Sequence, residues 1–136
     1  MRTIGLDVGD KRIGVALSDP EGILASPFTV INRQEDNLDI KAITDIVKGK
    51  QVGRIVVGLP RSMDGSLGRQ AEKVEVFIQK LSEQSEVPVE SRDERLTTVA
   101  AKRLMRASST KKARGKIRYD APAAALILQG YLDEAR

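Results

Sequence analysis

The 136-residue chain contains no cysteine, no histidine and no tryptophan. Without cysteine there can be neither a disulfide nor a thiolate nucleophile, and without histidine there is no imidazole for a catalytic triad or for the usual zinc sites. A metal ion in this protein would have to be held by oxygen atoms, which favours a hard cation such as Mg²⁺.

Long hydrophobic runs are also missing. No segment approaches the roughly 20 apolar residues of a membrane helix. The first residues, Met1 to Thr3, lead directly into a strand pattern instead of a basic segment followed by an apolar stretch. We therefore expect a cytoplasmic protein with no membrane partner. The length and the 40% hydrophobic composition fit one domain that spans residues 1–136.

The net charge of +4 hides an uneven distribution of charge along the chain. Eight basic residues and no acidic ones lie between Lys102 and Tyr119, so the rest of the chain carries 15 basic and 19 acidic residues. A local basic segment is typical of contact with a polyanion, and a solvated loop is the alternative. The candidate phosphate contacts in this segment are Lys111, Lys112, Arg114 and Lys116.

The first 18 residues predict an antiparallel hairpin. Two stretches with alternating side chains, residues 3–8 and 12–18, flank a turn-forming Gly-Asp-Lys sequence. The period of two gives the hairpin one bulky apolar face and one face of small residues. Asp7 is the single carboxylate on the small-residue face, where glycines leave room for a helix or a ligand.

The remainder of the chain alternates between helix and strand patterns, which predicts an α/β layer fold with a mixed sheet. We expect strands at 25–31, within 51–59 and at 87–91. Pro27 lies near the start of the first of these strands, and the strand within 51–59 is expected to be central and parallel to its neighbour. We expect four helices: one at 38–48, one after the loop at 60–68, one after Thr97 or Thr98, and one from Asp120 onward. The first is expected to be capped by Asn37 or Asn32. The basic segment 108–118 is predicted to be a loop.

Asp7 acquires acidic neighbours in this arrangement. Asp120 begins the buried stripe of the last helix, and the alanines that follow it can approach the small-residue face of the hairpin closely. Glu94, at the carboxyl end of a strand, is the third candidate, with Asp93 as an adjacent competitor. A plain helix cap is the alternative role of Asp120, and a surface loop acid that of Glu94.

Three carboxylates held close together repel one another unless a cation neutralises them. Mg²⁺ fits such a site because it binds carboxylates and substrate phosphates together. With no histidine or cysteine available, we expect a metal-activated water to be the nucleophile in phosphodiester hydrolysis. Arg12, beside the hairpin turn, is a candidate phosphate contact, and the alternative is that the turn only requires polar residues. The few aromatic residues argue against base stacking as the main mode of recognition.

Four segments, in order along the chain, resemble the YqgF (RuvX-like) family of ribonuclease-H-like proteins. The segments are residues 5–16, residues 58–60 with 63–66, residues 93–98, and Asp120 followed by residues 123–129. The resemblance implies an α/β ribonuclease-H-like mixed sheet that starts with an antiparallel hairpin and carries helices on both faces. It also implies Asp7, Glu94 and Asp120 as metal-binding catalytic acids.

Members of that family are described as nucleases for pre-16S ribosomal RNA and as Holliday-junction resolvase homologues. The resemblance implies an endonuclease that uses Mg²⁺ or Mn²⁺, acts on the 5′ end of pre-16S rRNA during ribosome biogenesis, and works as a monomer or weak homodimer. Its expected partners are structured RNA, ribosomal precursor particles and branched DNA. Three alternatives stay open: a resolvase of four-way DNA, a non-catalytic nucleic-acid-binding module, and a phosphate-binding domain of the sugar-kinase and actin type.

Overall fold

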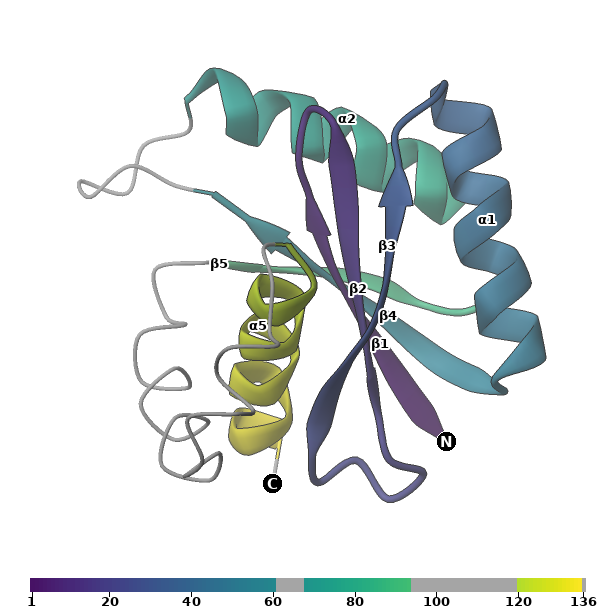
Figure 1. Ribbon diagram of the computed structural model, residues 1–136, viewed down its shortest axis with the longest axis vertical. Helices are drawn as coiled ribbons and strands as arrows, with labels where there is room; N and C mark the ends of the chain where they lie inside the picture. Colours follow the sequence, from purple (N-terminus) through teal and green to yellow (C-terminus); the bar gives the residue numbers. More distant parts are fainter. Residues whose placement is uncertain (61–67, 94–119, 136) are drawn as a thin grey trace.

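Five strands form one mixed sheet in the computed structural model, which describes residues 1–60, 68–93 and 120–135 (Figure 1). The strand order is β3-β2-β1-β4-β5. The first three strands are antiparallel neighbours, whereas β4 runs parallel to both β1 and β5. The strand bounds are β1 Arg2–Val8, β2 Arg12–Ser18, β3 Ala25–Asn32, β4 Val52–Leu59 and β5 Val89–Asp93. The predicted mixed sheet, its opening hairpin and the parallel interior strand are confirmed.

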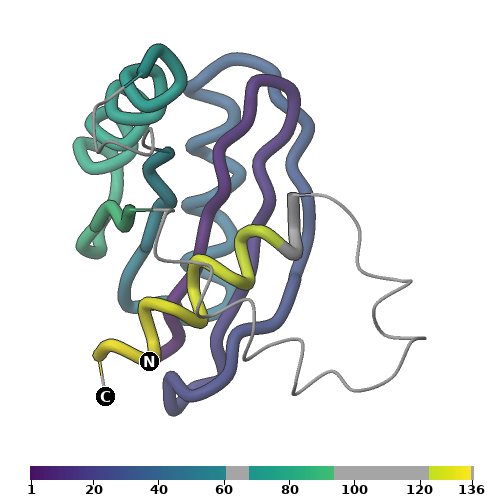
Figure 2. Tube along the Cα trace, turned by 90° about the vertical axis from the view of Figure 1, so that its left-hand side faces the viewer, coloured from purple at the N-terminus to yellow at the C-terminus, as the bar shows by residue number. Residues whose placement is uncertain are grey.

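Helices cover both faces of this sheet within the described residues. Helices α1 (Asp36–Gly49) and α2 (Arg69–Gln84) lie on one face, and α5 (Asp120–Ala135) crosses the other (Figures 1 and 2). None of the helices in the described ranges has the length and apolar character needed to cross a membrane.

The two faces of the hairpin differ as the alternation predicted. The bulky face of β1 and β2 is buried against α1 and α2, where it forms the larger core with side chains such as Ile4, Leu6, Ile13 and Val15. The opposite face packs small residues, including Ala16, against α5. A face built from small side chains lets a helix lie closer to the sheet than leucine or isoleucine would allow.

Two predicted boundaries were wrong. Helix α1 begins at Asp36, and its N-cap is Glu35, which makes no side-chain capping hydrogen bond, so neither Asn37 nor Asn32 caps it. Instead the carboxylate of Asp39 accepts the backbone N–H of Gln34 at 3.1 Å from within the helix.

Strand β5 covers residues 89–93 instead of 87–91. Pro88 has no N–H to donate, so the strand begins after it, although its carbonyl still accepts the N–H of Ile55 at 2.9 Å. Pro27 is tolerated because β3 is an edge strand. The helix predicted after Thr97 or Thr98, most of the 60–68 loop and the basic segment 108–118 lie outside the described residues.

Candidate active site

Asp7 lies near the carboxyl end of β1, an interior strand of the sheet. It pairs in register with Gly14 of β2, and its side chain is partly buried. It shares a face with Gly5, which is the face that α5 covers. Its neighbour opposite on β2 is a glycine, which has no side chain to extend over Asp7.

Helix α5 lies unusually close to this face. A Cβ atom on Gly5 would stand 2.7 Å from Cβ of Leu128 and 3.0 Å from the carbonyl oxygen of Ala124. Ala16, Ala124 and Leu128 belong to the same buried cluster. The predicted close approach of the last helix to Gly5 and Ala16 is therefore confirmed.

The direction of α5 follows from contacts one turn after Ala124. The Gln129 side chain accepts the N–H of Ala25 at 2.9 Å and donates to the carbonyl of Ile23 at 3.0 Å. Ala25 pairs with Ser18, whose Oγ accepts the N–H of Thr3 at 2.9 Å. Position 129 thus lies level with the start of β1, so the helix runs opposite to that strand.

This direction places the first turn of α5 at the end of the sheet where Asp7 lies. From Ala124 back to Asp120 the helix covers about 6 Å, and from Gly5 forward to Asp7 the strand covers about 6.5 Å. Figure 1 shows α5 running away from the hairpin-turn end of β1 toward the lower end of the view, where the N-terminus also lies. The helix therefore begins level with Asp7, and the side chain of Asp120 itself lies outside the described part.

Strand β5 ends at Asp93, and Glu94 lies outside the described residues. Since β1, β4 and β5 are parallel, their carboxyl ends meet at the same edge of the sheet. Asp93 pairs with Leu59, which belongs to the core under α1 and α2. Asp93 is therefore on the face opposite to Asp7, which argues against the competing choice of Asp93 as the third acid.

Arg92, one residue earlier, shares the face of Asp7 and was missed by the sequence analysis. It is buried, and its guanidinium donates to the Glu134 carboxylate at 2.6 and 3.1 Å. This pairing lowers the pKa of Glu134. The guanidinium packs directly on Gly130 of α5, where an added Cβ atom would lie only 2.8 Å from Nη2 of Arg92. Arg92 therefore ties the strand that leads to Glu94 to the helix that begins with Asp120.

A second tie joins α5 to β4 and β5 farther from the site. Glu90 accepts a hydrogen bond from Arg54 at 2.8 Å and also interacts with the hydroxyl of Tyr131 on α5. Burial, followed by the hydrogen bond to Glu90, raises the pKa of Tyr131, so the phenol stays neutral at physiological pH. Both ties are polar contacts, and the hydrophobic periodicity of the sequence does not predict them.

The hairpin turn places a cation near Asp7. The N–H of Gly9 donates to the carbonyl of Arg12 at 2.8 Å, which leaves two exposed residues at the tip. Arg12 is exposed and stands two residues before Gly14, so it shares the face of Asp7. The diagonal separation of two such positions on neighbouring strands is about 7–8 Å. The other candidate phosphate contacts, Lys111, Lys112, Arg114 and Lys116, lie outside the described residues.

The donor chemistry at this edge fits a hard divalent cation. Asp7 offers carboxylate oxygens on a face of small residues, and α5 begins at the same level with an aspartate. Within residues 1–60, 68–93 and 120–135, no three acidic side chains come close enough together to form a metal site. Because Glu94 and the Asp120 side chain lie outside those residues, the three-acid site stays a prediction.

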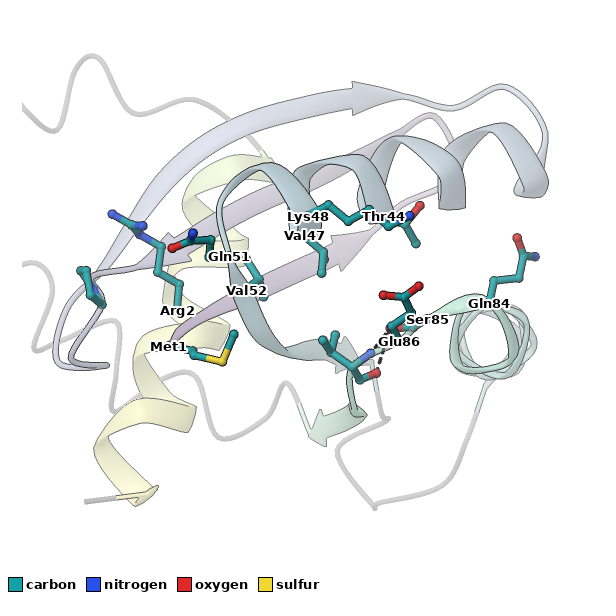
Figure 3. Close-up of a pocket in the computed structure, with 12 residues that line it drawn as sticks. Met1, Arg2, Thr44, Val47, Lys48, Gln51, Val52, Gln84, Ser85 and Glu86 are labelled. Atoms are coloured by element: carbon teal, nitrogen blue, oxygen red, sulfur yellow. Dashed lines mark hydrogen bonds between the residues drawn. The ribbon is translucent and has the colours of Figure 1, made fainter.

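A pocket of about 500 Å³ lies at the other end of the sheet (Figure 3). It is formed where β1 and β4 begin and where α1 and α2 end, with Met1, Val47, Val52 and Val87 among its lining residues. Its one acidic side chain is Glu86. The pocket therefore has no role in the chemistry expected around Asp7.

Comparisons with known proteins bear on the family and the fold. Residues 1–134 match the family model described as "RuvX: Holliday junction resolvase". The proteins named "Putative pre-16S rRNA nuclease" from Desulforamulus reducens and Moorella thermoacetica are 47% and 49% identical over 133 residues, which is 98% of this chain and 97% and 95% of theirs. The solved structure "T. thermophilus RuvC in complex with Holliday junction substrate" superposes with a TM-score of 0.66 at 14% identity, over 99% of this chain and 95% of that one.

Proposed function

This chain belongs to the RuvX family, and from that premise we propose that it is a metal-dependent endonuclease that hydrolyses phosphodiester bonds in structured nucleic acid. The observation that carries the proposal is the placement of Asp7: a partly buried carboxylate on a small-residue face, level with the start of a helix that begins with Asp120. Residues 1–136 act as one nuclease domain in this proposal.

Asp7, Glu94 and Asp120 would hold Mg²⁺ or Mn²⁺. When bound, the metal supplies the Lewis acid and activated water that phosphodiester hydrolysis needs in a chain without histidine or cysteine. The chain's own part is to hold three carboxylates ionised and oriented. Asp7 sits on an interior strand between two hydrogen-bonded neighbours. The C-terminal half of α5 is fastened to β3 through Gln129 and to β5 through Glu134, which supports the position of the helix on the sheet.

Basic residues would orient the substrate backbone. Arg12 would contact a phosphate near Asp7, and Lys111, Lys112, Arg114 and Lys116 would contact phosphates farther along the strand. Contacts of this kind recognise the shape and charge of a nucleic acid and not its base sequence. The composition agrees with this mode of recognition, because the chain has only two phenylalanines and two tyrosines on which bases could stack.

Pre-16S rRNA is the substrate we propose, because the relatives reported above are named as nucleases of that RNA, and the resemblance found in the sequence points to its 5′ end. Four-way DNA is the second candidate, and the description of the family model favours it. The protein would act in the cytoplasm on ribosomal precursor particles, as a monomer or weak homodimer. A non-catalytic nucleic-acid-binding module is the remaining alternative, and the match over residues 1–134 favours the RuvX family over the sugar-kinase type.

Cleavage of end-labelled precursor 16S rRNA and of a four-way DNA junction, assayed side by side, tests the proposal. Each substrate is incubated with Mg²⁺, with Mn²⁺ and with EDTA. The proposal predicts metal-dependent cuts at a defined position, faster in the RNA than in the junction. Faster cutting of the junction would show that four-way DNA is the preferred substrate. Binding without cutting of either substrate would support the non-catalytic module.

A further inference from the structure

The β1–β2 turn contacts Lys73 of α2 through an exposed pair with Asp10 at 3.7 Å, and it is held more firmly by Arg33, which follows β3. Its backbone N–H donates to the carbonyl of Lys11 at 2.9 Å, and its Nη1 donates to the carbonyl of Gly9, also at 2.9 Å. These two carbonyls belong to the turn that separates Asp7 from Arg12. Arg33 therefore holds the turn from the backbone and from the side chain at once.

The guanidinium of Arg33 is itself fixed from several directions. Its Nε donates to the buried carboxylate of Asp39 at 2.7 Å, and its Nη2 donates to Asp36 at 2.9 Å. The central carbon of the guanidinium, Cζ, lies 5.2 Å from the ring centre of Phe77 on α2. Two carboxylates and a ring thus determine where Nη1 points, and Nη1 points to Gly9.

We propose that Arg33 is a positioning residue for substrate binding, and that it acts through the turn on Arg12. The inference rests on the proposed function. Arg33 is already paired with two carboxylates, so its charge is compensated and it makes a poor phosphate contact of its own. Arg12 is exposed and begins the strand that leaves the turn. Holding the turn fixes the direction in which the Arg12 guanidinium leaves the sheet.

A lysine cannot replace Arg33 in this role. Lysine carries a similar charge, but its single ammonium group lacks the planar fork that reaches Asp39, Asp36 and Gly9 together. The variant Arg33→Lys therefore keeps the charge and the backbone hydrogen bond to Lys11, and it removes the side-chain hydrogen bond to Gly9. Arg54→Lys is the matched control, because Arg54 also donates to a carboxylate at 2.8 Å but contacts β5 instead of the turn.

The test is the salt dependence of nucleic-acid binding, measured without divalent metal on the same precursor RNA and DNA junction. Each phosphate contact contributes about 0.7–0.9 to the slope of log Kd against log salt concentration. Arg12→Ala should reduce the slope by about one contact. Arg33→Lys should reduce it by the same amount, and the double variant should reduce it no further. Arg54→Lys should leave both the slope and Kd unchanged.

Two results would overturn the inference while the proposed function stands. An unchanged slope in Arg33→Lys would show that the turn needs no such anchor, and a double variant that loses two contacts would show that the two arginines act independently. If circular dichroism shows that Arg33→Lys does not fold, the variant Asp36→Asn replaces it in the test, because it removes the partner of Nη2. Strictly additive effects of Asp36→Asn and Arg12→Ala on Kd would then reject the inference. If the wild-type protein binds neither probe, the proposed function fails and this inference fails with it.

Discussion

Gly5 of β1 and Leu128 of α5 approach so closely that a Cβ atom on Gly5 would lie 2.7 Å from Cβ of Leu128. Contacts of this length do not occur between real side chains, so any larger residue at position 5 must push α5 away from the sheet. The helix that moves is the one that begins with Asp120. The packing of a single glycine therefore links the stability of the fold to the geometry expected at the active site.

Gly5→Ala should lower the free energy of unfolding by about 1–3 kcal/mol, the usual effect of overpacking a well-packed interface. It should also lower the rate of cleavage, because α5 carries Asp120. Urea unfolding and the cleavage assay measure the two effects. The matched control is Gly49→Ala in α1, where a Cβ would meet no atom within 4 Å. A Gly5→Ala protein as stable as the control would contradict the close packing.

Asp39→Ala should be among the most destabilising single changes in α1. The Asp39 side chain is 2% exposed and pairs with Arg33 at 2.7 Å, so its removal leaves a partly buried guanidinium short of one partner. Breaking such a pair costs about 3 kcal/mol. Asp45→Ala is the control, because Asp45 is 63% exposed and lies 3.6 Å from Lys41, a surface pair whose loss costs less than about 1 kcal/mol. Similar urea midpoints for the two variants would refute the expected difference.

The stability conferred by Asp36 should depend on pH. The hydrogen bond from Lys80, with a further contribution from Arg33, lowers the pKa of Asp36 below its ordinary value of 3.8. A carboxyl group with a lower pKa in the folded state stabilises the fold above its unfolded pKa, and this contribution is lost as the pH falls through the folded pKa. The difference in unfolding free energy between the wild type and Asp36→Asn should be constant near neutral pH and decrease below about pH 4. A difference that grows on acidification would show the opposite sign of coupling.

The basic segment provides a prediction that rests on the sequence alone. Replacing Lys111, Lys112 and Arg114 together with alanine should weaken binding to RNA and to junction DNA alike. It should also reduce the salt slope by as much as about 2–3, one phosphate contact for each residue removed. Filter binding at several salt concentrations measures both quantities. An unchanged slope would remove this segment from the nucleic-acid interface.

Much of the site's framework could be predicted because it follows from local periodicity. The period of two in β1 and β2 placed Asp7 on the small-residue face, and the helical spacing from Asp120 identified the stripe that packs there. Both features are readable from residues adjacent along the chain. The close approach at Gly5 followed from the size of the side chains alone.

The features that could not be predicted depend on contacts between distant segments. Arg33 fixes the hairpin turn 24 residues earlier, and Arg92 pairs with Glu134 42 residues later. The start of α1 was misplaced for a local reason, since Asp39 accepts the Gln34 N–H from within the helix and no asparagine caps it. The position of Asp93 on the face opposite to Asp7 follows from its pairing with Leu59, which only the sheet register supplies.

Single-turnover cleavage by Asp7→Asn tests most directly whether Asp7 is a catalytic acid. The measurement uses saturating Mg²⁺ and whichever substrate the wild-type protein cuts, with Asp45→Asn as the exposed-acid control and circular dichroism to confirm that both variants fold. We expect Asp7→Asn to lose more than about 100-fold in rate, since even indirect partners of a metal site are worth 10- to 100-fold, while Asp45→Asn cuts like the wild type. A rate for Asp7→Asn within a few-fold of the wild type would place the catalytic centre elsewhere.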